Sequence, residues 1–280
     1  MKQSPMPAPQ PHRLRFIFPS DVIEPRKPDE AFLDQIEAFR EAGFPTSVVS
    51  IEYLQMGERR IHPRPEPDET VVYRGWMMNA ADYRAFCEAV SATGAMPLTG
   101  ADTYLACHHL PNWYPFIAEF TPRTVTFPPD ADLASELKAL DWEAYFIKDH
   151  VKSLKTDSGS ILRSTEGVGR LVADMVKFRG EIEGGFCVRE VEDFIPESEV
   201  RYFVILGIPF SNDPNQPVPD IVVEAASRIR SPFFSVDVIR RSDGVERIVE
   251  IGDGQVSDVV GWTPARLAAA WKHQAGQPPR

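Results

Sequence analysis

Three carboxylates near the C-terminus are the residues best suited to chemistry. Asp237 lies within the apolar run FFSVDVI and Glu250 within RIVEIG, and Asp253 follows between two glycines. The dipeptide Asp243-Gly244 between the runs is typical of a β-hairpin turn, so Asp237 and Glu250 are expected to be near cross-strand neighbours. Two carboxylates on one apolar face repel each other and are costly to desolvate, and Mg²⁺ would resolve both costs. The sequence predicts a metal site at Asp237 and Glu250, with Asp253 as a third oxygen ligand.

The alternative interpretation of this hairpin is that one of the two carboxylates faces solvent, because half of the residues of a one-sided strand do so. A second group of residues favours the metal site. Lys148 lies inside the strand-like run YFIKDHV, where a lysine requires a nearby anion. Lys152 and Lys155 follow it, and the small residues of TDSGS have backbone N–H groups suited to covering phosphates. The alternative for KSLKTDSGS is a solvated loop, and no Walker A pattern is present.

Further candidates lie at strand ends. Glu190 and the Val191 backbone stand between two strand-like segments, where a planar base could hydrogen-bond. Glu199 and Arg201 share one side of a strand, and a solvent-facing salt bridge is the alternative for this pair. Arg74 ends a strand of the N-terminal region, where ligands of open α/β sheets gather, so it is a candidate for binding a carboxylate substrate. A structural salt bridge is the alternative for Arg74.

The elements that position these residues change in character along the chain. The N-terminal half has the βαβ pattern of an open parallel sheet, with strands expected at 13–19, 44–51 and 69–78 and helices at 29–43 and 79–94. A short helix and an aromatic loop are expected over 102–117.

The second half has an α+β pattern. Its strands are expected at 143–151, 185–194, 200–210, 233–241 and 246–252, with an acidic link at 195–199, and its helices at 165–180, 219–230 and 263–274. The predicted fold class is α/β plus α+β, arranged as a tail (1–12), a small N-terminal α/β domain (13–125), a second domain (126–274) and a tail (275–280).

Composition limits the function classes. The 280 residues carry 30 basic and 41 acidic side chains, a net charge of −11, which argues against a nucleic-acid or anionic-membrane binder. Three scattered cysteines fit a reducing cytoplasm better than a disulfide scaffold. There is no apolar run of the roughly 20 residues that a membrane span needs. A cytoplasmic protein is expected, and its oligomeric state is left open.

Taken in chain order, Lys148, TDSGS, VREVEDF, EVRYFV, FSVDVI and VEIGDGQ resemble the ATP-grasp family over roughly residues 120–262, and look most like its R2K clade. The resemblance implies a pre-ATP-grasp unit followed by an ATP-grasp domain. It assigns the nucleotide phosphates to Lys148 and Lys155 (or Lys152), adenine to Glu190 and Val191, ribose to Glu199, the transferring phosphoryl group to Arg201, and Mg²⁺ to Asp237, Glu250 and Asp253.

Two departures from the family pattern accompany the resemblance. Asp253 stands where the family commonly has asparagine, and a lysine expected near residues 120–125 is missing, with Arg123 as the candidate substitute. The resemblance implies a ligase that uses ATP and Mg²⁺, with Mn²⁺ possible, to join a carboxylate to an amine through an acyl phosphate. The substrate would be a small molecule, a peptide or a protein tail. The alternatives are a phosphotransferase on the same fold and a catalytically degenerate nucleotide-binding module.

Overall fold

The structure is a computed structural model that describes residues 14–151, 160–179 and 182–276. It divides into two compact units, and neither is one continuous segment. The first unit comprises Met1–Leu105, Arg201–Val236 and Gly252–Arg280, and the second comprises Ala106–Val200 and Asp237–Ile251. The predicted domains 13–125 and 126–274 stay predictions. Lys152, Lys155 and residues 156–159, which carry the predicted phosphate loop, lie outside the described residues, as do residues 1–13 and 277–280.

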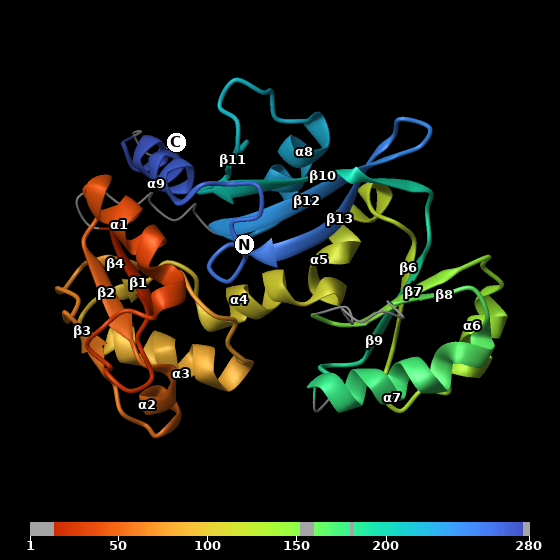
Figure 1. The fold of residues 1–280 in the computed structure, drawn as a ribbon, viewed down its shortest axis with the longest axis horizontal. Helices are drawn as coiled ribbons and strands as arrows, with labels where there is room; N and C mark the ends of the chain where they lie inside the picture. The colour runs from red at the N-terminus through yellow and green to blue at the C-terminus, as the bar shows by residue number, and fades with distance from the viewer. Residues whose placement is uncertain (1–13, 152–159, 180–181, 277–280) are drawn as a thin grey trace, which may run out of the picture. The chain divides into compact units, whose positions relative to one another are not determined.

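A mainly parallel sheet forms the centre of the first unit, as the N-terminal pattern predicts. Its order is β3-β2-β1-β4-β5, with β1, β2, β4 and β5 parallel and β3 antiparallel at one edge (Figure 1). The strands are β1 (Leu14–Pro19), β2 (Thr46–Val49), β3 (Ile61–His62), β4 (Thr70–Tyr73) and β5 (Met96–Pro97).

Helices cover both faces of this sheet because successive side chains of a strand point to opposite faces. Leu14, Phe16 and Phe18 of β1 share a core with helices α1 (Leu33–Glu41) and α9 (Pro264–Ala275). Ile17 belongs to the other core, which includes α3 (Ala80–Ser91). The parallel strands are therefore buried on both sides, and their carboxyl ends carry the polar loops.

Capping residues mark three helix ends of the first unit. The Asn79 side chain accepts from the Asp82 N–H, and the Thr263 side chain accepts from the Arg266 N–H. Gly43 has a positive φ of 94°, which suits a residue that follows a helix. The predicted helix at 29–43 begins with the 3-10 turn η2 (Glu30–Phe32), and α2 (Ile51–Gln55) is a short helix that the pattern did not predict.

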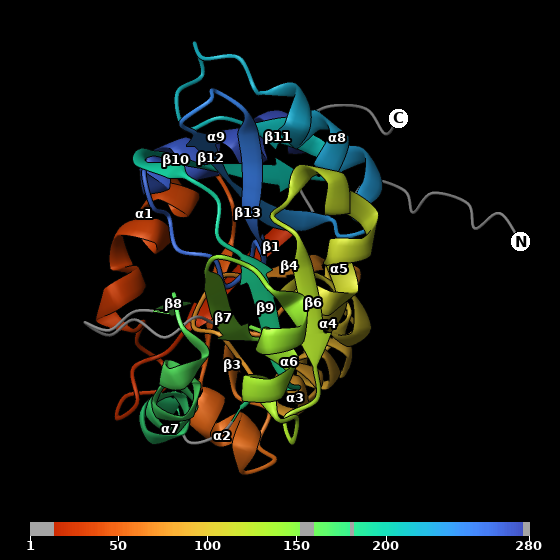
Figure 2. The same ribbon diagram turned by 90° about the vertical axis from the view of Figure 1, so that its right-hand side faces the viewer.

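The second unit contains an antiparallel sheet of order β6-β9-β7-β8. Figure 2 shows β6, β9 and β7 side by side. One face forms a core with the helices that include Leu133, Leu137, Leu171 and Met175. The elements are β6 (Thr124–Phe127), β7 (Tyr145–Asp149), β8 (Ile161–Leu162), β9 (Phe186–Glu190), α6 (Leu133–Leu140), η4 (Thr165–Gly167) and α7 (Val168–Arg179).

A third sheet has the order β11-β10-β12-β13, and β10, β12 and β13 each contribute residues to both units. The predicted hairpin turn is confirmed, since the Gly244 N–H donates to the Arg241 carbonyl (2.9 Å) and Gly244 has a φ of 89°. The elements are β10 (Phe194–Ile205), β11 (Ile208–Phe210), α8 (Asp220–Arg228), β12 (Phe233–Arg241) and β13 (Glu246–Asp253).

Two predictions of local structure are wrong. Residues 195–199 are not a link but part of β10, whose first half is largely exposed and therefore tolerates acidic residues and a proline. The region 102–117 forms two helices, α4 (Ala101–His108) and α5 (Leu110–Ile117), followed by η3 (Ala118–Phe120). Pro111 lies in the first turn of α5, where no backbone N–H is required. Among the described residues, no helix is long and apolar enough to cross a membrane.

Candidate active site

A polar face of the β6-β9-β7-β8 sheet carries the predicted phosphate lysine. Lys148 pairs with Cys187 across β7 and β9, on the side opposite Ile147 and Val188, which pack into the helix-covered core. Lys148 is 5% exposed. Burial raises the pKa of Cys187 to about 12 although Lys148 and Arg189 act against it, so this thiol stays protonated and unreactive.

Lys148 forms an ion pair with Glu250 of β13, as its place in an apolar strand requires. The Nζ–Oε1 distance is 3.5 Å, and the exposed fractions of the two side chains are 6% and 46%. A buried cation thus reaches a carboxylate that is half open to solvent. The structure therefore brings together two of the residues that the sequence singled out, from positions far apart in the chain.

The hairpin of β12 and β13 contains an irregularity that bears on the position of Asp237. Near the turn the Arg241 N–H donates to the Val245 carbonyl (2.9 Å), and at the far end the Gly254 N–H donates to the Phe233 carbonyl (3.0 Å). In a regular antiparallel pair the two residue numbers of every such bond have the same sum. Here the sum is larger by one at the far end, so we infer that β13 holds one extra residue, a β-bulge.

The bulge places Asp237 opposite either Val249 or Glu250. They face the same side if the extra residue lies between the turn and Glu250, because Asp237 is then opposite Glu250. A Cβ built on Gly252 would lie 3.0 Å from the Ser235 Oγ, so this side of Gly252 faces Ser235. With the extra residue there, Glu250 shares its side with Gly252 and Asp237 shares its side with Ser235, because the side chains of a strand alternate. Asp237 is buried, at 3% exposed.

Asp237 and Glu250 are the types of residue found at a Mg²⁺ site whose other ligands come from a nucleotide. Mg²⁺ is commonly bound through one or two carboxylates, with water and substrate phosphates as its other ligands. Across residues 14–151, 160–179 and 182–276, no group of three or more His, Cys, Asp and Glu side chains is arranged to hold a metal ion. A site with two carboxylates is what the described part of the second unit can offer.

The segment after β9, predicted to meet adenine, is fixed by hydrogen bonds within the second unit. The Glu190 N–H donates to the Arg123 carbonyl (2.9 Å), and the Val191 N–H donates to the Ala144 carbonyl (3.3 Å). The Val191 amide is therefore used by the protein in this conformation. The assignment of adenine to Glu190 and Val191 stays a prediction, and any backbone contact from Val191 would fall to its carbonyl.

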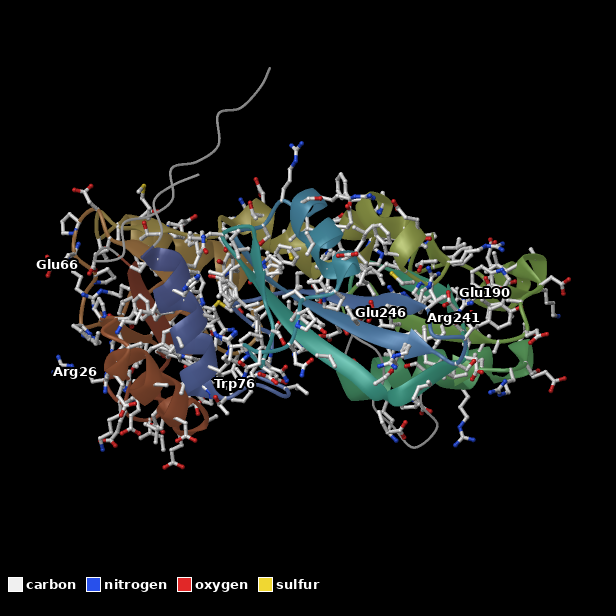
Figure 3. All side chains as sticks on the ribbon, turned by 90° about the horizontal axis from the view of Figure 1, so that it is seen from above. Arg26, Glu66, Trp76, Glu190, Arg241 and Glu246 are labelled. Carbon is white, nitrogen blue, oxygen red and sulfur yellow. The ribbon has the colours of Figure 1, made fainter. Side chains whose placement is uncertain are left out.

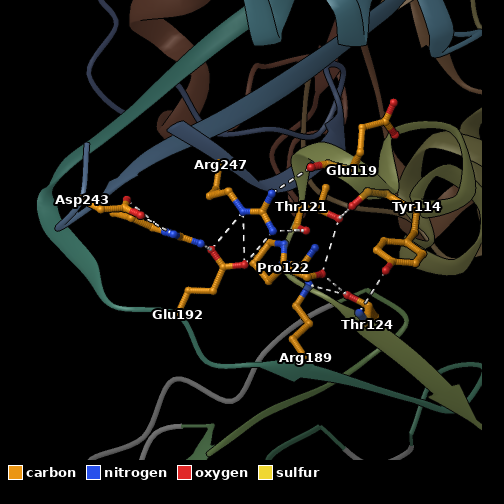
Figure 4. Close-up of polar contacts among 11 residues, drawn as sticks. Tyr114, Glu119, Thr121, Pro122, Thr124, Arg189, Glu192, Asp243 and Arg247 are labelled. Carbon is orange, nitrogen blue, oxygen red and sulfur yellow. Dashed lines mark hydrogen bonds and ion pairs between the residues drawn. The ribbon is translucent and has the colours of Figure 1, made fainter. Parts of the chain in front are cut away.

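Glu192, which the sequence analysis did not single out, anchors this segment to the hairpin. Its carboxylate accepts from the Arg247 Nε at 2.9 Å and from the Arg247 guanidinium again at 2.7 Å. Arg247 also donates to the carbonyls of Glu119 (2.8 Å) and Thr121 (2.7 Å) (Figure 4). Arg241, labelled in Figure 3, adds a longer contact to Glu192 at 3.4 Å. Glu192 thereby ties the predicted adenine segment to both strands of the hairpin that carries Asp237 and Glu250.

Arg123 and Arg189 both lie next to Glu190, but they differ in burial. The Arg123 guanidinium lies over the Trp142 ring, 4.9 Å from its centre, and its side chain is exposed. Arg189 is 4% exposed, and its Nε donates to the Thr124 hydroxyl (3.3 Å). Burial lowers the pKa of Arg189, and Glu250 is the first of the groups that raise it. Arg189 is thus a second buried cation on the face that carries Lys148. No sequence signal indicated it.

The remaining predicted residues lie in the first unit or at its boundary. Glu199 is exposed on β10 in the second unit, and Arg201 continues that strand in the first. An Arg201 amino group donates to the Asp258 carbonyl (2.8 Å), and the Trp262 indole donates to the Arg201 carbonyl (2.9 Å). The roles of Glu199 at ribose and of Arg201 at the phosphoryl group stay predictions.

Arg74 is fully enclosed in the first unit. Its guanidinium donates to the Gln35 side chain (2.9 Å), to the Ser257 carbonyl (2.9 Å) and to the Gly254 carbonyl. Burial lowers the pKa of Arg74 to about 10. In this conformation Arg74 holds the segment that follows β13, and the prediction that it binds a substrate carboxylate would require some of these bonds to exchange.

Asp253 faces the interior of the first unit. Its Oδ1 accepts from the Gln255 N–H (3.0 Å) and the Gln255 side chain (3.1 Å), which in turn donates to the Tyr83 hydroxyl (2.7 Å). The Asp253 Oδ2 is buried and has no hydrogen-bond partner among the described residues. Burial raises the pKa of Asp253 to about 7, against the opposing effects of the Gln255 hydrogen bonds and of Arg74. Its role as a third metal ligand stays a prediction.

The raised pKa of Asp253 predicts a pH-dependent stability in the absence of metal. Between the ordinary value of 3.8 and about 7 the folded protein keeps a proton that the unfolded chain releases, so stability is lost as the pH rises through this window. The loss is on the order of a few kcal/mol. Asp253→Asn should remove it. In EDTA, the stability difference between Asp253→Asn and the wild type should change steadily from pH 4 to pH 8. A difference independent of pH would contradict the prediction.

The fold is that of the ATP-grasp ligases. Solved structures support this. D-cycloserine synthetase DcsG superposes with a TM-score of 0.61 at 15% identity, over 94% of this chain and 99% of that one. ATP-grasp ligase PsnB, complexed with minimal precursor, Mg and ADP, gives 0.60 at 12% over 94% and 97%. D-alanine-D-alanine ligase from Coxiella burnetii gives 0.62 at 10% over 94% of both chains.

The model of the ATP-grasp domain, R2K clade family 3, matches residues 134–273. The chain belongs to this family, which confirms the resemblance found in the sequence. None of the curated protein sequences matches the chain. The similarities to solved structures are all at low identity and establish the fold.

Proposed function

We propose that the protein is an ATP- and Mg²⁺-dependent ligase that joins a carboxylate to an amine or a related nucleophile through an acyl phosphate. The observation that carries the proposal is the ion pair of buried Lys148 with half-exposed Glu250, next to the strand β12 that carries buried Asp237. A carboxylate pair next to a buried cation is suited to the phosphates of a Mg²⁺–nucleotide complex.

In this proposal the chain's own residues bind and orient the reactants. Lys148 would donate to the nucleotide phosphates, and Asp237 and Glu250 would hold Mg²⁺, whose charge would offset that of the phosphate oxygens. A substrate carboxylate oxygen attacks the γ-phosphorus and ADP departs. The nucleophile then attacks the acyl carbon and loses a proton, and phosphate departs. The protein contributes positioning and charge stabilisation rather than a covalent step.

The proposed substrate class is a carboxylate of an amino acid, a peptide or a protein tail. The support comes from proteins of the same fold. PsnB has been solved with its precursor peptide and with Mg and ADP, and the D-alanine-D-alanine ligase and D-cycloserine synthetase are named for small products.

Product analysis tests the proposal. The protein is incubated with Mg·ATP and pools of amino acids and short peptides, with hydroxylamine added to intercept acyl phosphates. The expected products are ADP and phosphate in equal amounts together with a hydroxamate. ADP with a stable phosphoester and no free phosphate would instead identify a phosphotransferase. Nucleotide binding without any Mg²⁺-dependent ADP formation would identify a non-enzymatic module.

A further inference from the structure

Arg189 is a buried cation on the face of the sheet that carries Lys148. It pairs with Phe146 across β9 and β7, while Lys148 pairs with Cys187. Lys148 and Arg189 are therefore diagonal neighbours on one face, a relation in which side chains start roughly 7–8 Å apart and long ones can act on one group. Two cations placed this way can act on one anion.

The hydrogen bonds of Arg189 use only part of its guanidinium. The Nε donates to the Thr124 hydroxyl at 3.3 Å, and one amino group donates to the Val249 carbonyl. The other amino group is buried and has no hydrogen-bond partner among the described residues. Leaving a buried charged donor unsatisfied is costly, so this amino group calls for a partner such as water, an ion or a ligand.

The charges around Arg189 do not supply that ligand. Among the anions near Arg189, Glu250 has the largest effect on it. However, the Glu250 carboxylate pairs with Lys148, and its side chain is 46% exposed. Glu192, the next carboxylate, is held by Arg247. The Trp113 ring lies 5.7 Å from the guanidinium, a stacking contact that does not use the N–H donors.

We propose that Arg189 binds a phosphate oxygen of the nucleotide together with Lys148, and so is the second phosphate-binding cation of this site. The inference rests on the proposed function. A planar guanidinium can hold the Val249 carbonyl with one amino group and a phosphate oxygen with the other. Because Val249 precedes Glu250, Arg189 connects the phosphates to the strand that carries a metal carboxylate.

Arg123 provides a matched control. It is the cation that the sequence offered for this role, but its guanidinium lies over Trp142 and its side chain is exposed. Arg189→Met and Arg123→Met remove the same charge from the same unit. Arg189→Lys keeps the positive charge but loses the paired N–H donors of the guanidinium. It replaces Arg189→Met in the test if that variant does not fold. Thr124→Val removes only the hydroxyl that orients the Arg189 Nε.

Calorimetric titration of the full chain with Mg·ATP, ADP and adenosine tests the inference. Arg189→Met and Arg189→Lys should weaken ATP and ADP binding by about 10- to 100-fold, the effect of losing a hydrogen bond to a charged group, and leave adenosine binding unchanged. Arg123→Met should bind all three as the wild type does. Melting of each variant without ligand reports on folding.

The outcomes separate the inference from the function on which it rests. If the wild type binds ATP and the Arg189 variants bind it equally well, the inference is overturned and the proposed function stands. If the Arg189 variants lose ATP and adenosine binding alike, Arg189 holds the fold rather than a phosphate, and the inference is again overturned. If the wild type binds no ATP, the proposed function itself fails.

Discussion

Replacing Glu250 by Gln is expected to lower Mg²⁺-dependent ADP formation by about 100- to 1000-fold, the effect of losing one essential electrostatic contact in an active site. The change keeps the side-chain shape and removes the charge that would hold Mg²⁺. The Glu250 side chain is 46% exposed but its partner Lys148 is buried, so losing the ion pair should also cost about 1–3 kcal/mol of stability. A melt of the variant without ligand shows that it remains folded under the assay conditions, so that the loss of activity can be assigned to the site.

Glu246→Gln is the matched control for Glu250→Gln. Glu246 begins the same strand, has an exposed side chain and loses the same charge (Figure 3). Its ADP formation should stay within about twofold of the wild type, because a surface charge away from a site contributes little. Equal losses in the two variants would show that the charge of the strand matters rather than the position of Glu250.

Replacing Arg74 by Met is expected to destabilise the protein by about 3–5 kcal/mol, because it leaves buried acceptors without donors. The Gly254 and Ser257 carbonyls and the Gln35 side chain all accept from Arg74. Urea denaturation without nucleotide measures the loss. Arg84→Met, an exposed change on α3, should cost less than about 1 kcal/mol. A similarly small loss for Arg74→Met would show that these hydrogen bonds are not structural.

Local signals explain why the hairpin and the parallel sheet could be predicted. Asp243-Gly244 sets the turn between β12 and β13, and alternating or continuous apolar runs mark the strands. Asn79 and Thr263 mark the starts of α3 and α9 through their own side chains. These features depend on residues that are neighbours in sequence, so sequence alone reveals them.

The roles of Arg189, Glu192 and Arg74 depend on partners distant in the chain. Arg189 bonds the carbonyl of Val249, and Glu192 pairs with Arg247. Short charged runs such as VREVED look like solvated surface until the strand that covers them is known. The segment 195–199, which contains two glutamates, shows the opposite error. Its composition resembles a link, but it lies within the exposed half of β10.

The prediction for Asp253 does not take side-chain alternation along β13 into account. The sequence predicts that Asp253 joins Glu250 at the metal, but its Oδ1 bonds Gln255 within the first unit. Side chains alternate along a strand, so an odd number of steps from Glu250 turns Asp253 to the other side. The bulge inferred in β13 depends on pairing with β12, which no local pattern specifies.

A thermal melt with and without Mg·ATP tests the central claim, that Lys148, Asp237 and Glu250 form a Mg²⁺–nucleotide site. The wild type should melt about 5 °C higher or more when ATP is 100-fold above its dissociation constant, because binding to the folded state stabilises it by about 2.7 kcal/mol. The rise should need Mg²⁺ and shrink in Glu250→Gln. No rise in the wild type, or the same rise in Glu250→Gln, would contradict the account.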